Sequence, residues 1–228
     1  RVKLMQAEGV VFRTGMDVGG AVPAEQLLAD FDAVVLCCGA KKPRDLNVPG
    51  RDAKGVHFAV DYLTSVTKSL LDSGFADGKA INAAGKNVLV IGGGVIGMEF
   101  ASLYQMLGCQ VTVLEAMDRI LPNMDREVCQ NLSMILKKRG VQIFAGARVE
   151  QVEKAEEGYT VRFTQKGQSA QVQGEVVLCA IGRRPNTQGL FSPDFSVEQE
   201  RGRILVDENF QTSVPGVYAI GDIVPGPA

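Results

Sequence analysis

The chain has 228 residues, of which 46% are hydrophobic and 22% charged, and its formal net charge is −2. Such a composition suits a globular protein of one large or two small domains, and no basic block of the kind that binds nucleic acid stands out. No apolar run approaches the length of a membrane helix, no secretory segment is visible, and the cysteines have no spacing typical of a metal or redox site. We therefore expect a cytoplasmic protein with buried, reduced cysteines that binds neither nucleic acid, membrane nor metal.

The first fifty residues alternate short apolar runs with polar connections. They predict a strand over residues 10–13, a short helix over 24–29 and a buried strand over 33–37. That strand ends at Gly39, and a loop rich in charged residues and proline follows over 41–50.

A helix is expected next, over residues 56–72, because Tyr62 and Val66 belong to a set of apolar residues on one helical face. His57, the only histidine, is expected at the surface or in a loop. The small and polar stretch 77–85 predicts a linker into the following segment.

The most informative segment of the chain is Gly92-Gly93-Gly94-Val95-Ile96-Gly97 together with its flanks. An apolar strand over 87–91 precedes it, and a helix over 100–107 follows. A second strand over 110–115 then finishes in an acidic residue. This order of strand, Gly-x-Gly-x-x-Gly, helix, strand and acid is that of a dinucleotide-binding βαβ unit.

Each residue type has a physical role in such a unit. Gly92 permits the tight turn, Gly94 lets the backbone approach a pyrophosphate, and Gly97 lets the helix pack closely. The open amides at the helix start face the phosphates. Glu115, 21 positions after Gly94, can accept hydrogen bonds from an adenosine ribose and would repel a 2′-phosphate, which favours NAD(H) over NADP(H). The plainer alternative is a glycine-rich turn between packed elements.

Beyond Glu115 the pattern continues as alternating helix and strand. A helix of about 15 residues is expected, capped by Asn123 or Asp125 and ended by Gly140, with a strand over 141–144 behind it.

The last eighty residues read as strands. Residues 149–163 predict a hairpin, and the continuous apolar run 176–181 predicts a fully buried strand. Two short strands, over 204–206 and 217–220, close the chain.

Four motifs resemble the pyridine nucleotide–disulfide oxidoreductase family, and residues 88–228 are most similar to its dihydrolipoamide dehydrogenase branch. The motifs lie at 92–101, 111–115, 180–187 and 216–222. The resemblance implies that NAD and FAD are the cofactors, and it implies roles for individual residues. The glycine-rich loop would line the NAD pyrophosphate, Glu115 hold the adenosine ribose, Glu99 lie near the nicotinamide, Val149 and Gly182 edge the NAD site, and Asp222 hydrogen-bond the ribityl chain of FAD.

Residues 1–87 are more similar to the small, flavin-containing subunit of NADPH-dependent glutamate synthase, and that pattern would place Gly39 near FAD. Two features depart from it. Val95-Ile96-Gly97 stands where that subunit usually has Asp-Thr-Gly, and Glu115 stands where a residue suited to NADPH is usual. The chain is thus an unusual family member, a recombinant or a splice of two related enzymes.

The expected fold is α/β, with a three-layer Rossmann-like NAD-binding domain over residues 83–203. Residues 1–50 and 204–228 would form part of a related FAD-binding domain, joined by a connecting helix and linker over 51–82. Because the chain starts at Arg1 in what reads as mid-domain, without a first FAD motif or redox disulfide, we expect a fragment.

Three functions remain open at this level. The first is the NAD(H)-binding part of an FAD-dependent oxidoreductase, with no catalytic side chain of its own and with a partner subunit or a homodimer. A glutamate synthase-type electron-transfer module is a variant of it. The second is a non-catalytic NAD-binding module. The third is a methyltransferase, which the late Ala-Ile-Gly-Asp motif ending at Asp222 argues against.

Overall fold

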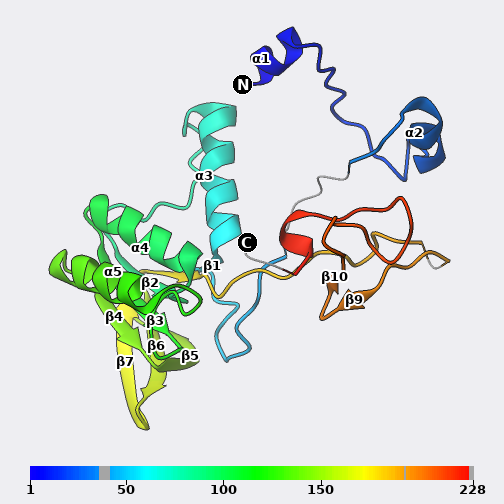
Figure 1. Cartoon of the computed structure of the whole chain (residues 1–228). Helices are drawn as coiled ribbons and strands as arrows, with labels where there is room; N and C mark the ends of the chain where they lie inside the picture. The colour runs from blue at the N-terminus through cyan, green and yellow to red at the C-terminus, as the bar shows by residue number, and fades with distance from the viewer. Residues whose placement is uncertain (36–41, 193, 226–228) are drawn as a thin grey trace. The chain divides into compact units, whose positions relative to one another are not determined.

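The computed structural model describes residues 1–35, 42–192 and 194–225 (Figure 1). It divides the chain into two compact units, residues 1–39 and 40–228. The first unit holds two short helices, α1 (Val2–Ala7) and α2 (Ala24–Asp30), and none of its described residues is buried. The helix expected over 24–29 is confirmed by α2.

Two expectations for the first unit differ from the structure. The strand expected over residues 10–13 is wrong, because this stretch is irregular and has no neighbouring strand to pair with among the described residues. Residues 33–35 are not in a strand either, while the rest of the expected strand, Cys37, Cys38 and Gly39 lie outside the described residues.

The second unit contains a mixed α/β arrangement. Its elements in chain order are β1 (Val56–Phe58), α3 (Ala59–Ser73), β2 (Asn87–Ile91), α4 (Val95–Met106), β3 (Gln110–Glu115), α5 (Arg126–Lys138), β4 (Gln142–Ala145), β5 (Ala147–Lys154), β6 (Tyr159–Gln165), β7 (Gln168–Gly174), β8 (Val176–Cys179), β9 (Gln199–Glu200), β10 (Arg203–Ile204) and the 3₁₀ turn η1 (Gly221–Ile223).

A parallel sheet with strand order β1-β8-β2-β3-β4 forms the middle layer of this unit. Alternate residues of β2 serve its two faces, as the period of two in a strand requires. Val88 and Val90 pack with residues of α4 and α5, whereas Leu89 and Ile91 pack against the antiparallel sheet β5-β6-β7. The result is helices, parallel sheet and antiparallel sheet in three layers, which confirms the expected α/β class (Figure 1).

Several elements begin at other residues than the sequence predicted, because of contacts with distant parts of the chain. The segment expected to be one helix over 56–72 begins as strand β1, because Val56 and His57 pair with β8 before α3 starts. His57 is therefore partly buried in a strand and does not lie in a surface loop. Helix α4 begins directly after Gly94, earlier than the expected start at Phe100.

The hairpin expected over 149–163 is confirmed as β5 and β6, but a third strand, β7, extends it. Strand β8 is buried along its whole length, as its apolar run predicted. Residues 217–220 form no named strand; only Tyr218 bridges to Gln211.

A small hydrophobic cluster, separate from the packing on the two faces of the parallel sheet, lies near the end of the second unit. Its buried residues are Val197, Ile204, Ala219 and Val224. The three described cysteines, Cys109, Cys129 and Cys179, are buried and unbridged. None of the described helices is long and apolar enough to cross a membrane.

Candidate functional site

The glycine-rich turn between β2 and α4 is packed against protein on one side. Gly92 has a left-handed φ of +110°, and a Cβ atom there would come within 2.5 Å of the Ala180 carbonyl oxygen. A Cβ on Gly97 would overlap the carbonyl oxygen of Gly92. Both glycines are therefore required by the fold itself, because any side chain would push helix α4 or the end of β8 away from the turn.

The other side of the turn is open. Gly94 is the residue that precedes the first turn of α4, with a φ of −72°, and a Cβ atom on it would meet nothing within 4 Å. Val95 beside it is half exposed, while Ile96 packs against the core. The first amides of a helix lack partners within the helix and carry the positive end of its dipole, so this open side suits an anionic group.

Glu115 ends β3 next to this turn and is 7% exposed. Its carboxylate accepts hydrogen bonds from the backbone amides of Gly93 and, at 2.7 Å, Met117. A carboxylate offers about four acceptor positions, so two bonds leave capacity for ligand hydroxyls. The carboxylate that the sequence singled out thus contacts the glycine-rich turn directly.

Leu121 also contacts this turn, and no sequence signal pointed to it. Its amide donates to the Gly93 carbonyl oxygen over 2.7 Å, so the Gly93 residue is fixed at both its amide and its carbonyl. Leu121 has a φ of +47°, which is uncommon for a residue with a branched side chain. Its own carbonyl oxygen accepts a bond of 3.2 Å from the Cys129 thiol of helix α5.

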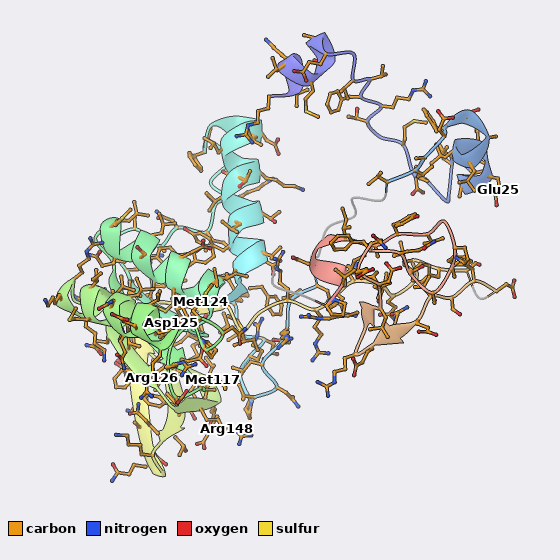
Figure 2. The ribbon with its side chains drawn as sticks, in the orientation of Figure 1. Glu25, Met117, Met124, Asp125, Arg126 and Arg148 are labelled. Atoms are coloured by element: carbon orange, nitrogen blue, oxygen red, sulfur yellow. The ribbon has the colours of Figure 1, made fainter. Side chains whose placement is uncertain are left out.

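The loop after Glu115 also joins the edge of the sheet. The amide of Gly146, between β4 and β5, donates to the Met117 carbonyl oxygen over 2.7 Å. Met117 lies in this loop, Met124 and Asp125 directly precede α5, Arg126 begins it, and Arg148 lies in β5; all five are labelled in Figure 2. The loop therefore links the glycine-rich turn, α5 and the start of the antiparallel sheet.

The remaining predicted site residues lie outside the turn itself, and Gly182 comes two residues after Ala180, whose carbonyl oxygen lies against Gly92. Glu99 is exposed on α4. Val149 is buried in β5, between the antiparallel sheet and the face of the parallel sheet that Leu89 and Ile91 form. Gly182, with a φ of +105°, follows β8 and accepts the Arg44 amide at 2.9 Å. Asp222 lies in η1 and pairs with Arg183 at 2.7 Å, while Gly39 is outside the described residues.

Cys179 is buried at the end of β8. Burial raises the pKa of its thiol, with the nearby Arg51 acting in the opposite direction. A buried thiol of raised pKa is a poor nucleophile. Among the described residues, no three His, Cys, Asp or Glu side chains gather in a way that could hold a metal ion. The site thus has the features of a binding site built from backbone groups and one carboxylate.

Comparison with known proteins adds a family. A family model described as pyridine nucleotide-disulphide oxidoreductase matches residues 2–228. Dihydrolipoamide dehydrogenase of Chaetomium thermophilum is 42% identical over 146 residues, which cover 62% of this chain and 29% of that protein. The small chain of glutamate synthase [NADPH] of Bacillus subtilis is 54% identical over 99 residues, which cover 43% of this chain and 20% of that protein. The likeness to both branches is confirmed, and the chain spans less than a third of either relative.

Solved structures show the same fold. A FAD-dependent pyridine nucleotide-disulphide oxidoreductase from Desulfovibrio vulgaris aligns with a TM-score of 0.61 and 30% identity, covering 85% of this chain and 46% of that one. A water-forming NADH oxidase from Lactobacillus brevis, bound to NADH, aligns with a TM-score of 0.62 and 25% identity, covering 81% and 38%.

Proposed function

The chain belongs to the pyridine nucleotide-disulphide oxidoreductase family, and from that premise we propose that it is the NAD(H)-binding part of an FAD-dependent oxidoreductase, most like dihydrolipoamide dehydrogenase. In the whole protein, bound NADH would supply a hydride to the flavin. The chemistry belongs to these cofactors, and the protein binds, orients and shields them.

One observation carries the proposal. The glycine-rich turn is filled by protein where Gly92 and Gly97 lie, and it is open where Gly94 lies. A turn that only connected two packed elements would have no need of a glycine at position 94, because its φ of −72° is accessible to any residue. The open side next to unpaired helix amides is where a pyrophosphate would bind.

Glu115 would select the coenzyme. It is buried and already fixed by two backbone amides, so its carboxylate is held in one orientation before a ligand arrives. That preorganisation reduces the ordering cost of binding ribose hydroxyls. The same fixed negative charge opposes a 2′-phosphate, so NADH is the expected coenzyme and NADPH the weaker one.

The flavin side of the proposal depends on fewer residues. Asp222 is paired with Arg183 through one carboxylate oxygen, Oδ2, which leaves Oδ1 to accept from a ribityl hydroxyl. The domain division expected from the sequence, the cytoplasmic location, and a partner subunit or homodimer stay predictions.

The decisive test replaces Gly94 by alanine. Because the added methyl group meets no protein atom, only a ligand would be affected. We expect NADH affinity to fall at least about tenfold while the free energy of unfolding changes by less than about 0.5 kcal/mol. Isothermal titration with NADH and urea unfolding measure the two quantities. Unchanged NADH affinity in Gly94→Ala would refute the proposed site.

Coenzyme choice is tested by titrating the unmutated chain and Glu115→Ala with NADH and NADPH. We expect the unmutated chain to favour NADH and the variant to lose most of that preference. A preference of the unmutated chain for NADPH would overturn the role of Glu115 and favour the glutamate synthase type of module, whose named relative is 54% identical over 99 residues.

Electron transfer from NADH to a dye after addition of FAD separates an oxidoreductase part from a non-catalytic NAD-binding module. Transfer that disappears in Gly94→Ala supports the first function. Tight NADH binding with no transfer supports the second.

A further inference from the structure

A cleft of about 900 Å³ lies between helix α5, strand β4 and the turn that joins β6 to β7. Ligand sites for small molecules commonly measure about 300–1,000 Å³, so this cleft has room for a molecule the size of a nucleotide. Neither the glycine-rich turn nor Glu115 lines it. It is therefore a second candidate site, separate from the one described above.

Positive charge is concentrated around this cleft. Its lining includes one carboxylate, Asp118, and five cationic side chains that come from three separate stretches of sequence: Arg119, Arg126, Lys137, Lys138 and Lys166. Among the described residues, none of these five forms an ion pair with a carboxylate. The whole chain has a net charge of −2, so the excess is local. A concave surface lined by one sign of charge attracts ligands of the opposite sign.

Arg119 gives the cleft a fixed donor. One terminal nitrogen of its guanidinium donates to the Pro122 carbonyl oxygen over 2.9 Å, which anchors the group. Its Nε is buried and has no hydrogen-bond partner in the described part of the chain. A buried donor without a partner is costly, so it adds no stability to the loop.

The floor of the cleft is apolar, although its rim is charged. Cys129 and Ile120 are buried there, and Ile143 and Met134 also line it. Ser133 and Gln130 add a hydroxyl and an amide on α5. An apolar floor with a cationic rim suits a ligand that joins a flat ring to a chain of phosphates better than it suits a bare anion.

We propose that this cleft binds a phosphorylated small molecule of nucleotide size, in addition to the dinucleotide assigned to the glycine-rich turn. The phosphates bind the two lysines at the end of α5, Lys137 and Lys138, and the ring lies on Met134 and Ile143. Arg126, labelled in Figure 2, is the first residue of α5, and Lys137 and Lys138 are its last two; all three line the cleft.

The test measures binding of ATP, tripolyphosphate and adenosine by isothermal titration without magnesium, with the full chain saturated by NADH. We expect ATP to bind with one-to-one stoichiometry, tripolyphosphate more weakly and adenosine most weakly. The double variant Lys137→Gln/Lys138→Gln should bind ATP at least about tenfold more weakly, because each charge-assisted bond contributes strongly. Its NADH affinity should stay unchanged.

The matched control is Lys68→Gln/Lys79→Gln, which removes the same charge from residues outside the cleft lining. It should bind ATP as the unmutated chain does. Gly94→Ala should also keep ATP binding, so failure of the NADH site and failure of this cleft can be distinguished.

Four results would overturn the proposal: no ATP binding at millimolar concentration, displacement of ATP by NADH in a one-to-one exchange, equal weakening in both double variants, or adenosine binding as tightly as ATP. Equal weakening would indicate a diffuse effect of net charge, and displacement would place ATP in the coenzyme site.

Discussion

Residues 1–35 and the three layers of the second unit contain apolar side chains of the same types, but most of these side chains are exposed in the first region and many are buried in the second. Val11 is 77% exposed and Leu28 is 72% exposed, whereas Val113 and Leu178 are fully buried. The difference is not one of composition. Strand β2 finds a neighbouring strand on each side and a helix above it, and this gives its apolar side chains a second surface to pack against.

Residues 1–35, the described part of the first unit, show no such arrangement of their own. Their helices are 6 and 7 residues long, below the length at which a helix is stable without packing. Apolar side chains alone therefore do not form a core; paired strands and helices that present matching faces are also needed.

The largest effect expected from this contrast comes from the same substitution made in both regions. Leu136→Ala removes a side chain that is 1% exposed, and the resulting cavity should lower the free energy of unfolding by about 2–5 kcal/mol. Leu28→Ala should change it by less than about 0.5 kcal/mol. Urea unfolding of both variants measures the difference. Similar losses of free energy of unfolding in the two variants would show that Leu28 is packed in a core, which would contradict its observed exposure.

A second variant tests why the layers pack so closely. Gly97→Ala adds a methyl group onto the Gly92 carbonyl oxygen and should cost about 1–3 kcal/mol. Helix propensity alone would favour alanine by about 1 kcal/mol, so the sign of the change shows which effect dominates. Gly94→Ala, where the methyl group meets nothing, is the control. A stabilised Gly97→Ala would mean that α4 can move away from the turn at no cost.

The Arg183–Asp222 ion pair tests the opposite extreme, a contact at the surface of the second unit. Its side chains are 42% and 39% exposed, so water screens the attraction. Arg183→Gln should therefore lower the free energy of unfolding by less than about 1 kcal/mol. A larger loss, measured in urea at low and high salt, would assign this pair a structural role comparable with that of the core.

The smallest expected effect concerns His57 in the edge strand β1. Burial lowers its pKa below 6.5; Asp61 partly opposes this shift and Arg51 adds to it. Between the two pKa values the unfolded chain binds more protons than the folded one. The contribution of His57 to the free energy of unfolding is therefore fully present above the unfolded pKa, and it is lost as the pH falls through the folded pKa. As the only histidine, His57 gives one imidazole signal in an NMR titration. A midpoint at or above 6.5 would contradict partial burial.

Much of the local geometry of the candidate site could be predicted from the sequence, because its parts are close in the chain. The turn, its helix and the strand ending at Glu115 occupy residues 87–115, and the bond between Glu115 and Gly93 lies within that span. Local patterns are enough where each element packs on its neighbour in sequence.

Local sequence patterns were enough to predict the βαβ unit, the buried character of β8 and the tight packing at Gly92 and Gly97. Three other features could be seen only in the folded chain: Val56 enters the sheet beside β8, Leu121 adopts a positive φ and donates to Gly93, and five cationic side chains from different stretches line one cleft. These features depend on which distant segments of the chain pack together. The free energy of that packing is a property of the whole fold, so no short run of residues encodes it.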